Sequence, residues 1–208
     1  MNPLTCCFLY GIVDLGYVAP DQVATMTARL LQGGVDILQL RAKEYPKKKI
    51  LKCAETMLPL TRAVGVPLIL NDYPDLLREV DADGCHVGQE DVDIASAREL
   101  AGRNCIIGKS THTLAQAQAA ERERADYIGF GPLFPTGTKP AAKAIGLSVI
   151  RTLHEQVNLP VFCIGGVKLE NLREILRAGA KRVCIVSDLL LATDVASRTT
   201  EVKSVLSV

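Results

Sequence analysis

The sequence predicts an α/β fold, a single (β/α)8 TIM barrel that occupies residues 1–208 as one domain. The chain has 208 residues, and barrels of roughly 200–250 residues are ordinary. Short apolar runs alternate with amphipathic runs along the whole chain. The apolar runs are apolar on both faces, which is typical of parallel strands covered by helices. The alternative is an open doubly wound sheet, which rarely needs eight equal units.

The strands and helices follow one another in regular order. Strands are predicted over residues 7–14, 36–40, 68–71, 84–87, 105–108, 127–130, 161–164 and 183–186. Helices are predicted over residues 21–32, 46–64, 75–80, 93–101, 114–123, 147–157, 169–178 and 191–205. Gly65 and Gly102 stand where two helices should end, and Asp21 and Thr113 stand where N-caps are expected.

Composition excludes several classes of protein. The net charge is +1 with no long basic or acidic block, which argues against nucleic acid as the main partner. No apolar run approaches the ~18 residues of a membrane span, and residues 1–13 fit a first strand better than a signal peptide. The 7 cysteines form an odd set without C-x-x-C spacing, so we expect buried thiols in a reducing, cytoplasmic setting.

Polar residues follow nearly every predicted strand. Barrel enzymes place their chemistry at these C-terminal strand ends, and a merely structural barrel would not need the polar groups. The residues are Asp14, Gln39, Arg41, Lys43, Asn71, Asp72, His86, Gln89, Asp91, Lys109, Ser110, Thr111, His112, Thr136, Lys139, Ser187 and Asp188.

The second strand carries alternate polar residues at its end. Gln39, Arg41 and Lys43 share one face, while Leu38 and Leu40 point to the other. A guanidinium fork and an ammonium group suit a diphosphate ligand. A solvated basic strand end is the alternative, chiefly for Lys43.

Two carboxylates follow neighbouring strands, Asp72 after the third and Asp91 after the fourth. Mg2+ is commonly held by one or two carboxylates together with substrate phosphates and water. The pair therefore predicts a metal-diphosphate site opposite the cations. The alternative, equally weighted from spacing alone, is that each aspartate caps the helix that follows it.

A second phosphate site is predicted after the seventh and eighth strands. Gly165 and Gly166 allow close backbone approach, and Ser187 adds a hydroxyl. A simple glycine turn is the alternative. The two sites together fit the joining of two phosphorylated partners, with diphosphate as a leaving group.

The stretch from Asp126 to Pro140 runs from a strand into a loop with anion-binding groups. Gly129 and Gly131 suggest close approach of a ligand or another backbone. Thr136, Gly137, Thr138 and Lys139 supply hydroxyls, a backbone N–H and a cation for phosphate, and we expect this segment to close over the substrates as a lid.

The three histidines carry less information. His154 is predicted at the surface, His86 in the core or at the mouth, and His112 beside the substrate or at a helix cap. No HExxH, Ser-His-Asp or Cys-His pattern stands out, so hydrolysis by a protein nucleophile is not the leading hypothesis.

Six motifs, taken together and in order along nearly the whole chain, resemble the thiamin-phosphate synthase family. They are Gln39-Leu40-Arg41-Ala42-Lys43, Leu70-Asn71-Asp72, Gly84-Cys85-His86-Val87-Gly88-Gln89-Glu90-Asp91, Ile107-Gly108-Lys109-Ser110-Thr111-His112, the run from Gly129 to Lys139, and Ile164-Gly165-Gly166-Val167. The long run and the Gln-x-Arg-x-Lys motif are specific, whereas the Gly-Gly pair alone is not.

The resemblance implies a Mg2+-dependent barrel transferase. It would join hydroxymethylpyrimidine diphosphate to a carboxylated thiazole phosphate, releasing diphosphate and carbon dioxide and giving thiamin phosphate. Each part of the site has implied residues: for the pyrimidine diphosphate Gln39, Leu40, Arg41, Ala42, Lys43, Asn71, Ser110 and Lys139; for Mg2+ Asp72 and Asp91; for the thiazole phosphate Thr136, Gly137, Thr138, Gly166, Val186 and Ser187. Arg41, Lys43 and Lys139 would be the catalytic cations.

Two rival functions stay open. A related thiazole tautomerase would bind thiazole phosphate without needing the metal-diphosphate residues, and a non-catalytic phosphate-binding barrel would show no turnover. The expected partners are small molecules, with no nucleic acid and no membrane. The sequence does not give the oligomeric state, and a homodimer is compatible with it because barrel enzymes are often dimers.

Overall fold

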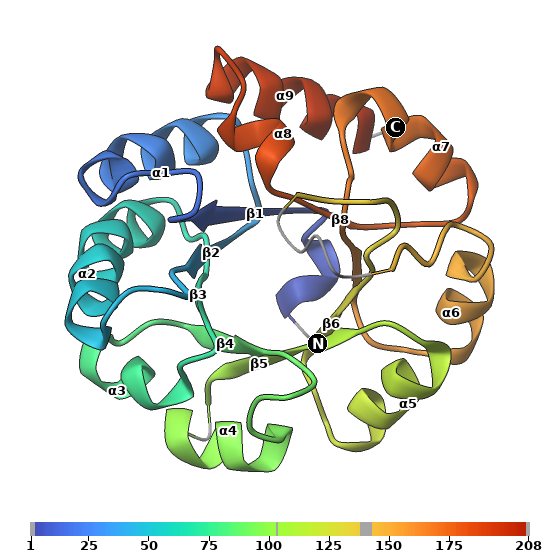
Figure 1. The fold of residues 1–208 in the computed structure, drawn as a ribbon, viewed down its shortest axis with the longest axis horizontal. Helices are drawn as coiled ribbons and strands as arrows, with labels where there is room; N and C mark the ends of the chain where they lie inside the picture. Colours follow the sequence, from blue (N-terminus) through green and yellow to red (C-terminus); the bar gives the residue numbers. More distant parts are fainter. Residues whose placement is uncertain (1–2, 103, 138–142, 207–208) are drawn as a thin grey trace.

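Eight parallel strands close into a barrel in the order of the sequence, as the computed structural model shows for residues 3–102, 104–137 and 143–206 (Figure 1). The predicted (β/α)8 fold is therefore confirmed. The strands are β1 Leu9–Asp14, β2 Ile37–Arg41, β3 Leu68–Asn71, β4 Gly84–Val87, β5 Ile106–Thr111, β6 Tyr127–Phe130, β7 Val161–Cys163 and β8 Val183–Ile185. The barrel closes where β1 pairs with β8.

Helices form a ring outside the strands (Figure 1). The α-helices are α1 Val23–Gln32, α2 Lys47–Ala63, α3 Leu77–Val80, α4 Ile94–Ala101, α5 Leu114–Arg122, α6 Ile150–Gln156, α7 Leu169–Arg177, α8 Ser187–Leu190 and α9 Val195–Leu206. Three 3-10 helices accompany them: η1 Pro3–Cys6, η2 Pro20–Gln22 and η3 Pro74–Leu76. None of the helices in the described ranges combines the length and apolarity needed to cross a bilayer.

Several predicted boundaries are confirmed and others are wrong. Thr113 caps α5 by accepting a hydrogen bond from the Gln116 amide, whereas Asp21 lies inside η2 and caps nothing. Gly65 and Gly102 follow α2 and α4 with positive φ. The last helix, predicted over residues 191–205, begins only at Val195 as α9, and the short α8 precedes it directly after β8, where no helix was predicted.

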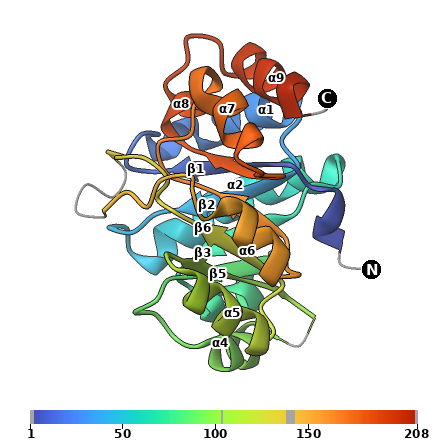
Figure 2. The same ribbon diagram turned by 90° about the vertical axis from the view of Figure 1, so that its right-hand side faces the viewer.

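The core has two layers. Apolar residues between strands and helices form the larger one, and Leu38 and Leu40 belong to it. The smaller layer fills the barrel interior and includes Tyr10, Tyr127 and Phe162. Leu4 of η1 joins it from the N-terminal end of the barrel, opposite the segment that follows β6 (Figure 2). The polar C-terminal end thus remains the open one.

The cysteines fit the expectation of buried thiols in most positions. Four of them are buried, at Cys53, Cys85, Cys163 and Cys184, and Cys6 is exposed; all seven are free thiols. Burial raises the pKa of Cys163 to about 12, so its thiolate is disfavoured at neutral pH. These buried thiols therefore act as small packing residues.

Candidate active site

The C-terminal end of the barrel opens into a cavity. Its floor is the apolar interior layer, with Ile12, Tyr127 and Phe162 among the residues that line it. Eight of the predicted site residues line the same cavity: Gln39, Arg41, Asn71, Ser110, Thr136, Gly166, Val186 and Ser187. Residues implied for the two different phosphate ligands are thus brought together.

The alternation predicted for β2 is confirmed. Gln39 is buried and its Nε2 donates to the hydroxyl of Tyr10 inside the barrel at 2.8 Å. Leu40 and Ala42 are buried in the opposite layer, against the helices. Their side chains face away from the cavity, so these two residues can offer a ligand only backbone groups.

Arg41 is held by Asp14, a residue that the sequence placed at the barrel mouth without giving it a partner. Its Nη1 lies 2.6 Å from Oδ2 of Asp14, which is 2% exposed and pairs with Arg41 across β1 and β2. The other oxygen of Asp14 accepts from the Gly16 amide at 2.9 Å. Asp14 therefore fixes one edge of the guanidinium, and the arginine keeps further N–H groups for a ligand.

Lys43, Asp72 and Asp91 form a charged cluster beside the cavity. The Lys43 ammonium lies 3.4 Å from Asp72 Oδ2, and Asp91 Oδ2 accepts from the Gly88 amide at 2.6 Å. Burial raises the pKa of Asp72 above its ordinary value, the neighbouring Asp91 carboxylate raises it further, and Lys43 lowers it. The two carboxylates are thus close enough to repel each other.

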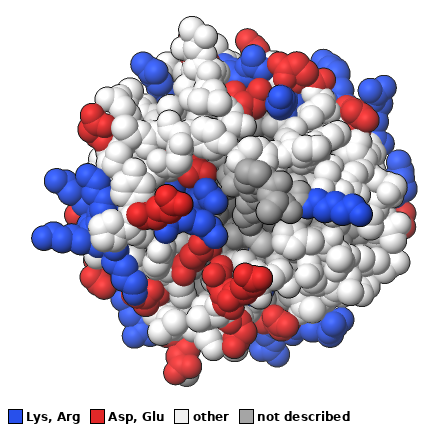
Figure 3. All heavy atoms as spheres, viewed as in Figure 1, with Lys and Arg blue, Asp and Glu red and all other residues white. Residues whose placement is uncertain are grey.

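Basic and acidic side chains gather next to the centre of the barrel mouth, over β2 to β4 (Figure 3). The helix-cap alternative for the aspartates is wrong, because Asp93 accepts from the Ser96 amide at the start of α4 and η3 has no side-chain cap. Asp72 instead adopts φ 67°, a left-handed conformation that aspartate tolerates better than most residues. Neither carboxylate caps a helix; Asp72 pairs with Lys43, and Asp91 accepts from the Gly88 amide.

Gly165 and Gly166 form a left-handed turn after β7, with φ 94° and 66°. A Cβ on Gly165 would lie 2.3 Å from Pro132 Cβ, and one on Gly166 would lie 2.7 Å from Phe134 Cβ. Both glycines are therefore required by the backbone and by the segment after β6. Close packing here leaves the turn facing the cavity, together with Ser187 at the start of α8.

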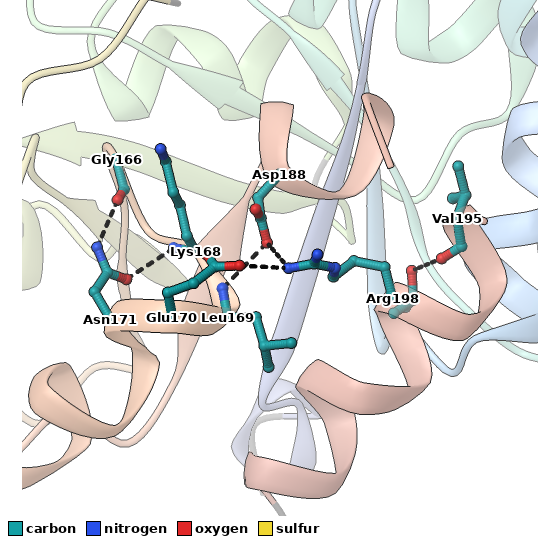
Figure 4. A network of polar contacts seen from close by, with 9 residues as sticks. Gly166, Lys168, Leu169, Glu170, Asn171, Asp188, Val195 and Arg198 are labelled. Atoms are coloured by element: carbon teal, nitrogen blue, oxygen red, sulfur yellow. Dashed lines mark hydrogen bonds and ion pairs between the residues drawn. The ribbon is translucent and has the colours of Figure 1, made fainter. Parts of the chain in front are cut away.

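A polar network holds this turn from behind (Figure 4). Asn171 Nδ2 donates to the Gly166 carbonyl at 2.9 Å, and its Oδ1 accepts from the Lys168 amide at 2.8 Å. Asp188 Oδ2 accepts from the Leu169 amide at 3.1 Å. The start of α7 is thereby tied both to the glycine turn and to α8.

Arg198 of α9 closes the network by contacting both acids. Its Nη1 lies 3.0 Å from Glu170 Oε1 and 3.5 Å from Asp188 Oδ2 (Figure 4). The last helix thus braces the elements that surround the predicted phosphate turn. The sequence did not indicate Asn171 or Arg198, because residues in helices give no hint of which loop they support.

The expected close approach is found at Gly131, whereas a Cβ on Gly129 in β6 would make an ordinary contact with the His86 side chain at 3.4 Å. A Cβ on Gly131 would lie 2.0 Å from the Ile164 carbonyl oxygen, so another backbone approaches there. Thr136 lines the cavity, and Gly137 lies near the Tyr17 hydroxyl. Thr138 and Lys139 lie outside the described residues, so the closing of this segment as a lid stays a prediction.

The three histidines lie in different environments. His86 lies at the cavity and hydrogen-bonds Tyr127 and Ser110. His112 also lines the cavity, and its Nδ1 contacts the Gly131 carbonyl. His154, predicted at the surface, is half-buried: its Nε2 has no hydrogen-bond partner among the described residues, and burial lowers its pKa to about 4.

These features define a (β/α)8 barrel whose open end brings the residues predicted for two phosphate sites to one cavity. The chain belongs to the thiamine monophosphate synthase family, whose model matches residues 9–189. It is 41% identical over 188 residues to thiamine-phosphate synthase of Shouchella clausii, covering 90% of each chain. It is 39% identical over 201 residues to the enzyme of that name from Chloroflexus aurantiacus, covering 96% of this chain and 93% of the relative.

A solved structure agrees with the family assignment. Thiamine phosphate pyrophosphorylase from Pyrococcus furiosus superposes with a TM-score of 0.88 at 35% identity, covering 97% of this chain and 96% of that one. (S)-3-O-geranylgeranylglyceryl phosphate synthase from Thermoplasma acidophilum superposes with a TM-score of 0.74 at 14% identity, which shows a shared fold alone.

Proposed function

We propose that this chain is a thiamin-phosphate synthase acting as a single TIM-barrel domain. It would couple hydroxymethylpyrimidine diphosphate to carboxylated thiazole phosphate, releasing diphosphate and carbon dioxide. The observation that carries the proposal is the shared cavity. Gln39, Arg41 and Ser110 line it together with Gly166 and Ser187, so two phosphorylated ligands can meet there.

On the pyrimidine side, the proposal gives each group a distinct task. Asn71 and Ser110 orient the ring, and Arg41 and Lys43 bind the diphosphate. Asp14 supports this role of Arg41, since a guanidinium held on one edge loses less freedom on binding. Lys139 remains a predicted third cation.

The residues present fit a magnesium ion. Within the described ranges, no group of three or more His, Cys, Asp or Glu is placed to hold a metal without further ligands. Asp72 and Asp91 form an adjacent pair, which suits Mg2+ because this ion commonly takes one or two carboxylates plus phosphate and water. When bound there, Mg2+ would neutralise charge on the diphosphate.

The coupling needs no protein nucleophile. The C–O bond to the diphosphate breaks, its electron pair leaves with the diphosphate, and the thiazole nitrogen attacks the pyrimidine-stabilised cation. The carboxylated carbon then loses carbon dioxide, keeps the electron pair of the broken C–C bond and takes up a proton, which gives the thiazolium ring of thiamin phosphate. Arg41 and Lys43 stabilise the charge that grows on the leaving group, and such electrostatic contributions are worth several kcal/mol.

On the thiazole side, the phosphate would lie against Gly166, Val186 and Ser187, with Thr136 above them. The backbone amides of a left-handed glycine turn make an anion-binding concavity. Gly137 and Thr138 complete this set as predictions. The free thiols are compatible with a reducing compartment such as the cytoplasm, where the enzyme would act.

The deciding experiment mixes the purified protein with both substrates and Mg2+ and measures diphosphate and thiamin phosphate. Equal amounts of both products are expected. Folded protein that forms neither product would overturn the proposal. Isomerisation of the thiazole phosphate without coupling would instead assign a tautomerase, and phosphate binding without turnover would assign a non-catalytic barrel.

A further inference from the structure

A chain of hydrogen bonds crosses the interior of the barrel beneath the cavity. Gln39 Nε2 lies 2.8 Å from the Tyr10 hydroxyl, which lies 2.9 Å from the Tyr127 hydroxyl. The Tyr127 hydroxyl lies 3.0 Å from His86 Nδ1, and His86 Nε2 lies 2.9 Å from Ser110 Oγ. The chain thus joins five strands, from β2 through β1, β6 and β4 to β5.

The two tyrosines in the middle of this hydrogen-bond chain are buried, which limits the partners that their hydroxyls can reach. Tyr10 is 2% exposed and Tyr127 is fully buried. Both rings meet the Phe162 ring edge-on, with centroids 5.3 and 5.7 Å apart. Among the described residues, the Tyr127 hydroxyl hydrogen-bonds Tyr10 and His86 alone. Burial raises the pKa of both phenols well above their ordinary value, so both remain neutral hydroxyls with one proton each.

The Gln39 amide at one end sets the donor-to-acceptor direction of all the hydrogen bonds in this series. An amide nitrogen only donates, so Tyr10 accepts from Gln39 and gives its own proton to Tyr127. Tyr127, having accepted from Tyr10, donates to His86 Nδ1. A neutral imidazole whose Nδ1 accepts carries its proton on Nε2, and that proton goes to Ser110.

We infer that Tyr10 and Tyr127 are positioning residues of the pyrimidine site. They hold His86 as the Nε2-protonated tautomer, and the Ser110 hydroxyl, already accepting from it, turns its proton toward the cavity. Ser110 is thereby a hydrogen-bond donor to a ring nitrogen, while Gln39 presents its carbonyl oxygen from the other end of the chain. This inference rests on the proposed function for the identity of the ligand, but the tautomer does not.

The tautomer is measured directly by ¹⁵N NMR of the full-length protein labelled at histidine, at neutral pH. His86 resonances are assigned from their loss in His86→Gln. We expect a protonated Nε2 and an unprotonated Nδ1 in the wild type, and a changed tautomer ratio in Tyr127→Phe. If His86 in the wild type is protonated on Nδ1 or on both nitrogens, it donates to Tyr127 instead of accepting from it. That result would overturn the inference, whether or not the protein couples its substrates.

Steady-state kinetics test whether Tyr127 acts through Ser110. Loss of one hydrogen bond of this kind corresponds to about a tenfold change, so Tyr127→Phe should raise KM for the pyrimidine diphosphate about tenfold. KM for the thiazole phosphate should stay within twofold. In a Ser110→Ala background the same change should cost less than twofold, because coupled residues are not additive.

The control for the kinetics is Tyr45→Phe, which removes a hydroxyl from a partly buried tyrosine packed against the outer core. It should leave both KM values within twofold. Equal losses from Tyr127→Phe in the wild-type and Ser110→Ala backgrounds would refute the positioning role. A wild type without coupling activity would refute the proposed function instead, and the NMR result would still decide the direction of the chain.

Discussion

Replacing Asp72 by asparagine removes one of two adjacent carboxylates with little change in shape. Asparagine also tolerates the positive φ of 67° at this position. Burial and the Asp91 carboxylate raise the pKa of Asp72, so its charged form costs stability in the folded protein. This cost grows as pH rises above the unfolded pKa. Without ligands, the Asp72→Asn variant should therefore be at least as stable as the wild type at pH 7.

With Mg2+ and inorganic diphosphate the order should reverse. A ligand at 100 times its Kd stabilises the folded state by about 2.7 kcal/mol. For a domain of this size that corresponds to a rise in Tm of roughly 5–10 °C. A tenfold weaker affinity in Asp72→Asn would leave about 1.4 kcal/mol at the same concentration, or about half the rise in Tm. Turnover should fall as well.

The assay is thermal unfolding with Mg2+ and diphosphate, each alone and together. Asp75→Asn is the matched control, because Asp75 lies three positions further along and pairs with the exposed Lys47. Exposed pairs contribute about 0–1 kcal/mol, so this control should keep the full Tm rise. Equal Tm rises in the wild type and Asp72→Asn would refute the metal assignment.

Three further variants probe the remaining parts. Asn171→Ala frees the glycine turn and should raise KM for the thiazole phosphate about 3–10-fold, while KM for the pyrimidine diphosphate stays within twofold. Gly131→Ala places a Cβ 2.0 Å from the Ile164 carbonyl oxygen, so denaturant unfolding should show a loss of at least ~2 kcal/mol; an unchanged midpoint would contradict this packing. His154 has its pKa lowered by burial to about 4, so wild-type stability should fall as pH drops from about 6.5 toward 4, by about 1–3 kcal/mol. His154→Gln should flatten that fall, and parallel pH curves for the two proteins would contradict the burial of this histidine.

Periodicity predicted the barrel well because each strand is buried on both faces and each helix shows one apolar side. The bounds of β3, β4 and β6 are as predicted. β5 is longer than predicted, because Lys109 and Ser110 resemble loop residues although they continue the pairing with β6. The short α8 was not predicted, because four residues are too few to show a helical period.

The candidate site was predictable where its chemistry follows strand order. Gln39 and Arg41 follow from alternation along one strand. The partnership of Arg41 with Asp14 also follows from neighbouring strand ends, once the barrel is assumed. The pairing of Tyr10 with Tyr127 does not, because they lie 117 positions apart and each reads as an ordinary apolar strand residue. Interior contacts across a barrel depend on side-chain size and direction, which no local pattern encodes.

The cavity separates charged groups from neutral ones, and this separation bears on the proposed chemistry. Its floor is built from aromatic rings and neutral hydroxyls, whereas Arg41 lines the cavity from β2, and Lys43, Asp72 and Asp91 form a charged cluster beside it. In the proposed function, the diphosphate would leave beside those cations, while the pyrimidine would stay over the apolar floor. Fixed charges and dipoles in such a site act more strongly than in water, because they need no reorganisation as the bond breaks. In the proposed function, the floor that orients the ring and the rim that receives the leaving group would therefore contribute to the same bond cleavage from two sides.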